Sequence, residues 1–111
     1  MKKINLKLST GDDDAIMSAL ELLQELDLEE TEEQAANNDN LIRLIFAKLS
    51  ARSGAFTPEE LRVIYAAVYC AHAVLSGRIP ADAESKKDLA PYLFHYNRLL
   101  PQLRPISDML Q

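Results

Sequence analysis

The stretch that most constrains the fold covers residues 57–80, because it holds a helix start, a helix stop and an almost unbroken apolar run between them. Thr57 and Glu60 have the Thr-x-x-Glu spacing of a capping box, and Pro58 stands at the first helical position, which proline favours. Gly77 stands where a helix-terminating glycine belongs, and Pro80 follows it. The sequence therefore predicts a helix that begins at Pro58 and ends before Gly77.

This predicted helix is apolar on every side. One face carries large side chains: Leu61, Ile64, Tyr65, Val68, His72 and Leu75. The opposite face carries small ones: Val63, Ala66, Ala67, Cys70, Ala73 and Val74. A helix that is apolar all round has to be covered all round. We therefore expect it either to lie at the centre of the protein, covered by the N-terminal arm or the C-terminal tail, or to lie in a subunit interface.

Cys70 is the single cysteine of the chain, and His72 follows two residues later. Each residue of a helix turns by about 100°, so side chains two residues apart point about 160° away from each other. An intact helix therefore keeps Cys70 and His72 from forming a catalytic thiol–imidazole pair. A single cysteine also cannot form an internal disulfide. We expect Cys70 to behave as a small, buried hydrophobic residue.

Three further helices are predicted around this one. Residues 12–26 place an apolar stripe at helical spacing: Ile16, Ala19, Leu20, Leu23 and Leu26. Thr31 and Gln34 have capping-box spacing. A second helix therefore begins there, or else after residues 37–40, whose short polar side chains disfavour helix, and it runs to about Arg52. Asp88 caps the last predicted helix, which follows a loop at residues 81–87 and ends at Pro101.

The first residues alternate apolar and polar side chains, with Ile4, Leu6 and Leu8 on one side, which is the period of a β-strand. No other segment stands out as a partner strand. Because a lone strand is marginal by itself, two arrangements remain open. The segment is either an ordered extended arm that lies on the helices, or a strand that pairs across a dimer or with a partner chain.

The chain has 111 residues, enough for one domain with a genuine core and too few for two. Its three glycines are too few for the many turns of an all-β fold. We therefore expect an all-α, four-helix bundle-like single domain. It would have an extended arm at residues 1–10, a helical body at residues 12–100 and a proline-punctuated tail at residues 101–111.

Charge is unevenly distributed along the chain, whose net charge is −5. Residues 12–33 carry ten acids and no base. Binding to nucleic acid needs a basic stripe, so this pattern disfavours it. The predicted docking surface for a basic partner protein comprises Asp14, Glu21, Glu25, Glu29 and Glu30. A solvated acidic face without a partner is the alternative.

A second candidate site consists of aromatic and histidine side chains: Tyr65, Tyr69, His72, Tyr92, His95 and Tyr96. Such rings can line a small-molecule pocket between the third and fourth predicted helices, or they can fill the core with their hydroxyls at its edge. The histidines and the cysteine lack the spacing of zinc ligands, and no nucleotide-binding or nucleophile-elbow motif occurs. We therefore expect no metal, no cofactor and no catalytic residues.

These observations favour a small non-enzymatic cytoplasmic protein that acts through protein–protein interaction, as a regulatory or inhibitor-like module and as a homodimer. No run of about 18 apolar residues occurs that would span a membrane. The lysines at the start of the chain are not followed by the apolar region of a secretion signal. The alternative function is a small-molecule-binding protein or an enzyme that uses the aromatic and histidine pocket.

Overall fold

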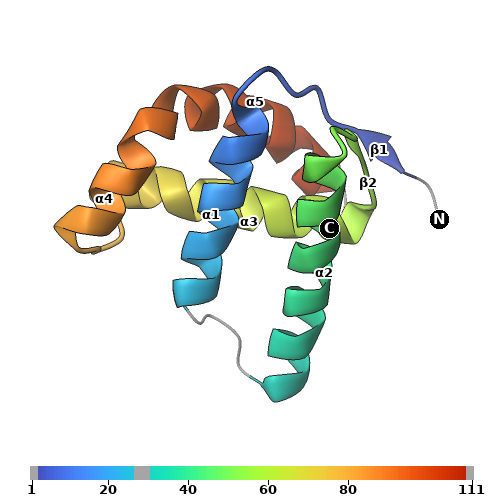
Figure 1. The fold of residues 1–111 in the computed structure, drawn as a ribbon, viewed down its shortest axis with the longest axis horizontal. Helices are drawn as coiled ribbons and strands as arrows, with labels where there is room; N and C mark the ends of the chain where they lie inside the picture. Colours follow the sequence, from blue (N-terminus) through green and yellow to red (C-terminus); the bar gives the residue numbers. More distant parts are fainter. Residues whose placement is uncertain (1–2, 27–30, 110–111) are drawn as a thin grey trace.

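The computed structural model describes residues 3–26 and 31–109, and in this part of the chain the protein is all-α and bundle-like, as predicted (Figure 1). Four long helices and one short helix of seven residues account for most of it. The elements in chain order are β1 (Ile4–Asn5), α1 (Asp12–Leu26), α2 (Glu32–Ser50), β2 (Ala55–Phe56), α3 (Pro58–Leu75), α4 (Ala83–Leu89), the 3₁₀-helix η1 (Ala90–Tyr92) and α5 (Leu93–Met109).

Helix α3 lies at the centre of the fold, which is the first of the two arrangements left open by its sequence, although helices rather than the arm alone cover it. In Figure 1, α1 and α2 cross in front of α3, and α5 passes over its other side. The buried residues of α3 come from both its large face and its small face, and they include Leu61, Val68, Cys70 and Val74. Other helices of the same chain therefore supply the cover that this apolar helix requires.

The ends of α3 follow their local sequence signals. The Thr57 side chain accepts a hydrogen bond from the Glu60 N–H at 3.2 Å, and the Glu60 carboxylate accepts one from the Thr57 N–H at 2.7 Å. This reciprocal pair is the predicted capping box. Gly77 has a φ of +83°, a left-handed conformation that favours glycine and terminates the helix.

Helix α1 has the predicted bounds, and its inward stripe is buried at Ile16, Ala19 and Leu20. Thr31 caps α2, as its side chain accepts a hydrogen bond from the Gln34 N–H at 3.1 Å. Of the two alternatives for the asparagine-rich residues 37–40, the structure has the continuous helix, because α2 runs through them to Ser50.

The predicted loop at residues 81–87 is wrong. Asp82 caps a helix there, its side chain accepting a hydrogen bond from the Ser85 N–H at 2.7 Å. Asp88 therefore lies in the last turn of α4 and does not cap the next helix. Burial of Leu89 against the core supplies the apolar contact that a helix of this length needs.

The predicted helix end at Pro101 is also wrong, because α5 continues through Pro101 and Pro105 to Met109. A proline in a helix interior removes one backbone hydrogen bond and crowds the preceding turn. Both prolines lie on the exposed side of α5, whereas Leu99 and Leu103 are buried on its inner side. Burial of the inner face therefore outweighs the loss of two backbone donors.

The N-terminal arm pairs within its own chain. Strand β1 is antiparallel to β2, with Ile4 opposite Phe56 and Asn5 opposite Ala55. The Leu6 N–H then donates to the Gly54 carbonyl oxygen at 2.8 Å. Gly54 permits this approach, since a Cβ atom there would lie 2.6 Å from the Leu6 carbonyl oxygen. The arm therefore pairs as a strand within its own chain, which neither of the two predicted arrangements included.

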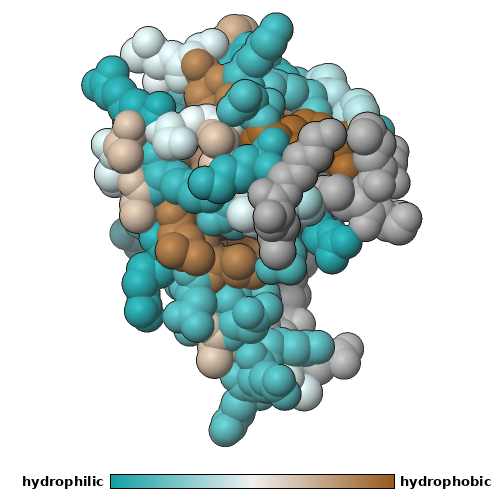
Figure 2. All heavy atoms as spheres, turned by 90° about the vertical axis from the view of Figure 1, so that its right-hand side faces the viewer, coloured by the Kyte–Doolittle hydropathy of each residue, from teal (hydrophilic) through white to brown (hydrophobic). Residues whose placement is uncertain are grey.

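No helix among the described residues is both long enough and apolar enough to cross a membrane. The face formed by α2 and by the paired strands β1 and β2 is largely hydrophilic, with apolar side chains in several separate patches (Figure 2). The large apolar side chains that remain exposed belong to different elements: Leu44 on α2, Tyr69 on α3, and Leu93 and Phe94 on α5.

Candidate functional site

The predicted acidic docking surface lies on the outer side of α1. Asp14, Glu21 and Glu25 are exposed and share one helical face, because they are spaced by seven and four residues. Glu29 and Glu30 lie outside the described residues. The inner side of the same helix is buried in the core, so packing turns these three carboxylates outward.

A small hollow lies between this face and α4, and we call it the acidic hollow. Its volume is about 90 Å³, and its lining consists of Ser18, Glu21, Leu22, Glu25, Ser85, Asp88 and Leu89. The lining therefore combines three carboxylates and two hydroxyls with two leucines that are mostly buried. None of the three carboxylates forms an ion pair with another residue in the described part of the chain. A hollow of this kind attracts an ammonium or guanidinium group.

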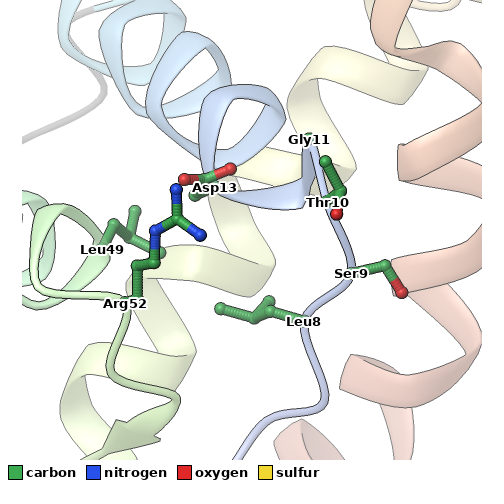
Figure 3. Close-up of a pocket in the computed structure, with 7 residues that line it drawn as sticks. All are labelled: Leu8, Ser9, Thr10, Gly11, Asp13, Leu49 and Arg52. Carbon is green, nitrogen blue, oxygen red and sulfur yellow. The ribbon is translucent and has the colours of Figure 1, made fainter.

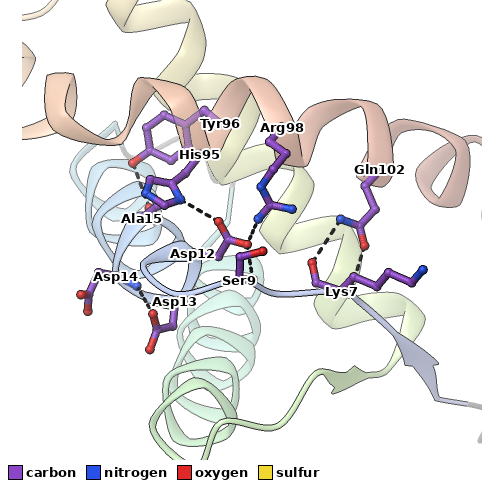
Figure 4. Close-up of polar contacts among 10 residues, drawn as sticks. All are labelled: Lys7, Ser9, Asp12, Asp13, Asp14, Ala15, His95, Tyr96, Arg98 and Gln102. Carbon is purple, nitrogen blue, oxygen red and sulfur yellow. Dashed lines mark hydrogen bonds and ion pairs between the residues drawn. The ribbon is translucent and has the colours of Figure 1, made fainter.

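Asp12, the first acid of α1, has a different role, because it is fully buried and contacts residues of the arm and of α5 (Figure 4). Its carboxylate accepts a hydrogen bond from His95 Nδ1 at 2.7 Å and one from the Ser9 N–H at 2.6 Å. It also forms an ion pair with Arg98. This network joins the arm, α1 and α5, so Asp12 acts in folding and is not part of the docking surface.

His95 and Tyr96 take part in the same junction. Gly11 has a φ of +92°, and a Cβ atom there would lie 2.9 Å from His95 Cε1, so the close approach of the arm to this ring requires glycine. The Tyr96 hydroxyl donates to the Ala15 carbonyl oxygen at 2.8 Å. Burial raises the pKa of Tyr96, and the phenol therefore stays protonated as a donor.

Next to this junction, Gln102 of α5 clamps the arm (Figure 4). Its side-chain oxygen accepts a hydrogen bond from the Lys7 N–H at 2.7 Å, and its side-chain nitrogen donates to the Lys7 carbonyl oxygen at 3.2 Å. The amide thus binds both polar groups of one arm residue. No local pattern in the sequence identifies this pairing or the contact of Asp12 with His95, because the partners are more than 80 residues apart.

The six residues of the predicted aromatic pocket fall into two groups. Tyr65 and Tyr69 lie together on α3, with their ring centroids 6.1 Å apart. Tyr92 lies 6.4 Å from the rings of both His95 and Tyr96. Within the described residues no ring contact joins the two groups, and none of the six side chains lines the acidic hollow or the pocket of Figure 3.

The first group belongs to a surface that the sequence analysis did not find, and we call it the Arg78 face. Its members are Tyr65, Tyr69, His72, Arg78 and Asn97. The Arg78 guanidinium lies over the Tyr69 ring, 5.3 Å from its centroid, and its Nη2 lies 3.1 Å from His72 Nδ1. His72 Nε2 is 2.9 Å from Asn97 Oδ1. Since a guanidinium can only donate, Nδ1 of His72 accepts, and Nε2 carries the proton that is donated to Asn97.

The pocket of Figure 3 lies between the end of the arm, the start of α1 and the end of α2. Its volume is about 230 Å³, and it is lined by Leu8, Ser9, Thr10, Gly11, Asp13, Leu49 and Arg52. The Arg52 guanidinium is turned toward the Asp13 carboxylate (Figure 3). A charged ligand of either sign would meet a like charge there, so this pocket does not select a ligand.

Within the described residues, no group of three or more histidine, cysteine, aspartate or glutamate side chains is placed to hold a metal ion. The chain matches no protein-family model, and neither the curated proteins nor the solved structures include a similar one. The inference about function therefore rests on the geometry of the chain itself.

Proposed function

We propose that this protein is a non-enzymatic binding protein that acts through protein–protein interaction, and that its acidic hollow docks a lysine- or arginine-bearing segment of a partner. The observation that carries this proposal is the set of Glu21, Glu25 and Asp88 around one hollow without a neutralising cation among the described residues. The cytoplasmic location expected from the sequence is part of the same proposal.

The chemistry of the hollow suits a long basic side chain. Lysine and arginine keep their methylene stems on apolar surface while the charged head stays with polar groups. Here the exposed edges of Leu22 and Leu89 offer a small apolar area for the stem, and the carboxylates offer acceptors for the head. Like-charged carboxylates that share a site repel each other, so a bound cation relieves this repulsion as well as forming new hydrogen bonds.

A synthetic lysine-rich helical peptide tests the proposal directly. The site variant Glu21→Gln/Glu25→Gln/Asp88→Asn removes the three carboxylates of the acidic hollow. The control variant Glu32→Gln/Glu33→Gln/Asp39→Asn removes three exposed acids of α2, so both variants have the same net charge. Isothermal titration calorimetry then compares peptide affinity, and circular dichroism confirms that both variants are folded.

We expect the site variant to bind the peptide at least about tenfold more weakly than the wild type, while the control variant loses much less. Binding should weaken as salt is raised from about 0.05 M to about 0.5 M, because exposed charges are screened over a shorter distance. Equal weakening in the two variants would mean that net charge alone attracts the peptide, and this would contradict a specific site.

A further inference from the structure

The Arg78 face presents a guanidinium that is held by side chains at the C-terminal end of α3, just beyond the last residue of this helix. Arg78 Nε donates to Ser76 Oγ at 3.1 Å, Nη2 donates to His72, and the flat group lies over the Tyr69 ring. Nη1 forms no hydrogen bond within the described residues. Because three contacts already hold the side chain, little conformational freedom is left to lose when a carboxylate binds.

Within the described residues, the side chains that contact the Arg78 guanidinium include no acid: they are Tyr69 and His72 of α3 and Ser76 at the C-terminal end of this helix. Positions 62, 65, 69, 72 and 76 share this face by helical spacing, and their residues are arginine, tyrosine, tyrosine, histidine and serine. Tyr69 is 38% exposed, so it adds apolar area next to the guanidinium. The face therefore combines a cation with aromatic surface, which complements the carboxylates of the acidic hollow on the same molecule.

We propose that the occupant of the Arg78 face is a second copy of this chain, with the Arg78 guanidinium of one copy entering the acidic hollow of the other between Glu21, Glu25 and Asp88. This inference rests on the proposed function of the hollow and names its partner. Arginine matches carboxylates with two parallel hydrogen bonds, so the contact is directional as well as attractive. The two surfaces differ, so each contact joins unlike faces of two copies.

This route to self-association differs from the one expected from the sequence. The apolar faces of α3 are covered by α1, α2 and α5, and the arm pairs with β2 of its own chain. The buried part of α3 and the paired arm are therefore not available as an interface, whereas Tyr69 stays 38% exposed. The complementary charges are exposed, by contrast, on α1 and α4 at one site and at the end of α3 at the other.

A mixing experiment with two variants tests the inference. The hollow variant is Glu21→Gln/Glu25→Gln/Asp88→Asn, and the face variant is Arg78→Gln. Arg43→Gln on α2 is the matched control, because Arg43 is also exposed and its loss changes the net charge equally. Sedimentation velocity follows each protein alone, and then an equimolar mixture of the hollow variant with the face variant, over a concentration series.

We expect the wild type and the Arg43→Gln control to associate alike, and each interface variant alone to associate at least about tenfold more weakly. The mixture should recover association, because the intact Arg78 face of the hollow variant meets the intact hollow of the face variant. A wild type that stays monomeric at high concentration overturns the inference, as does a mixture that associates no better than its components. Peptide binding by a monomeric wild type would leave the proposed function intact, so the two failures are distinguishable.

Discussion

At the scale of single residues, Glu60 shows how competing effects set the charge of a buried carboxyl. The side chain is only 2% exposed, and burial by itself would raise its pKa. Hydrogen bonds from Lys48 Nζ at 2.5 Å and from the Thr57 N–H at 2.7 Å, together with the charge of Lys48, outweigh burial and hold the pKa of Glu60 below its ordinary value of 4.5. Glu60 is therefore ionised in the folded protein at neutral pH.

The lowered pKa of Glu60 makes stability depend on pH. Its ionised form stabilises the fold above the unfolded pKa, and this contribution is lost as the pH falls through the folded-state pKa. Lys48→Met removes the cation, so we expect a loss on the order of 2 kcal/mol near neutral pH and a smaller further loss on acidification below about pH 4.5. Urea denaturation at a series of pH values measures this.

The matched control for Lys48→Met is Lys87→Met on the exposed surface of α4, which should change stability by less than about 0.5 kcal/mol. A Lys48→Met protein that loses as much stability in acid as the wild type would contradict the assignment of this pH dependence to Glu60.

Cys70 gives a second prediction at this scale. It is buried in the core, and burial raises the pKa of its thiol. Thiol labelling under native conditions should therefore be slow and should accelerate when the protein unfolds. Cys70→Ser should reduce the unfolding free energy by on the order of 1–3 kcal/mol, because a hydroxyl without a partner is buried. Labelling as fast as in the unfolded chain would show that this side of α3 opens to solvent.

At the scale of elements, α5 is a helix that its local sequence opposes. Pro101 and Pro105 interrupt its backbone hydrogen bonds. Packing opposes this loss, because Leu99 and Leu103 are buried in the core and the Gln102 side chain forms two hydrogen bonds with Lys7 of the arm. The helix forms because burial of its inner face stabilises its whole length, whereas each proline removes only one backbone hydrogen bond.

Pro101→Ala should therefore stabilise the protein, by about 1–3 kcal/mol, because it restores an N–H donor to the helix interior and removes the ring from the preceding turn. Pro91→Ala is the control, since Pro91 stands in the first turn of η1, where proline is tolerated. Thermal unfolding of both variants measures the difference. Equal effects of the two substitutions would mean that α5 is already adapted to Pro101.

At the scale of the whole molecule, burial is concentrated around α3 and declines toward one end of α2. The buried residues of α2 are Ile42, Ile45 and Leu49, all in its second half. Its first half, residues 32–40, consists of exposed and half-buried residues. The first half of α2 therefore depends on its Thr31 cap and on its own backbone hydrogen bonds more than on the core.

Hydrogen exchange should reproduce this gradient. We expect amides in the middle of α3 to exchange only through global unfolding, and amides of residues 35–40 to exchange fastest among the four long helices, through local opening. Thr31→Ala should accelerate exchange in the first half of α2 and leave α3 nearly unchanged. Mass spectrometry of peptic fragments measures both. Equal protection of the two segments would contradict the gradient.

Some elements of this fold can be predicted from residues that are close together in the sequence. The capping box at Thr57 and Glu60, the Thr31 cap and the apolar stripe of α1 each depend on residues within one or two helical turns, so the sequence predicts these helices and the all-α class. The sequence of α3 also requires cover on every side, because the helix is apolar on every side, but the sequence does not decide between cover by the same chain and cover by a second subunit. The outward row of acids on α1 follows from the sequence, since burial of the stripe leaves Asp14, Glu21 and Glu25 outside.

Other features depend on contacts between residues far apart in the chain, and no local pattern records them. Strand β2 has only two residues, too few to show a strand period, and it exists because β1 pairs with it. In the sequence, Asp12 cannot be told apart from the other acids in the first turn of α1. Its role depends on the contact with His95, which is 83 residues away in the chain. The acidic hollow needs Asp88 from α4, and the Arg78 face needs the chain to turn back after Gly77. Such sites form only when packing brings distant side chains together, because their energy comes from pairs of groups and not from either segment alone.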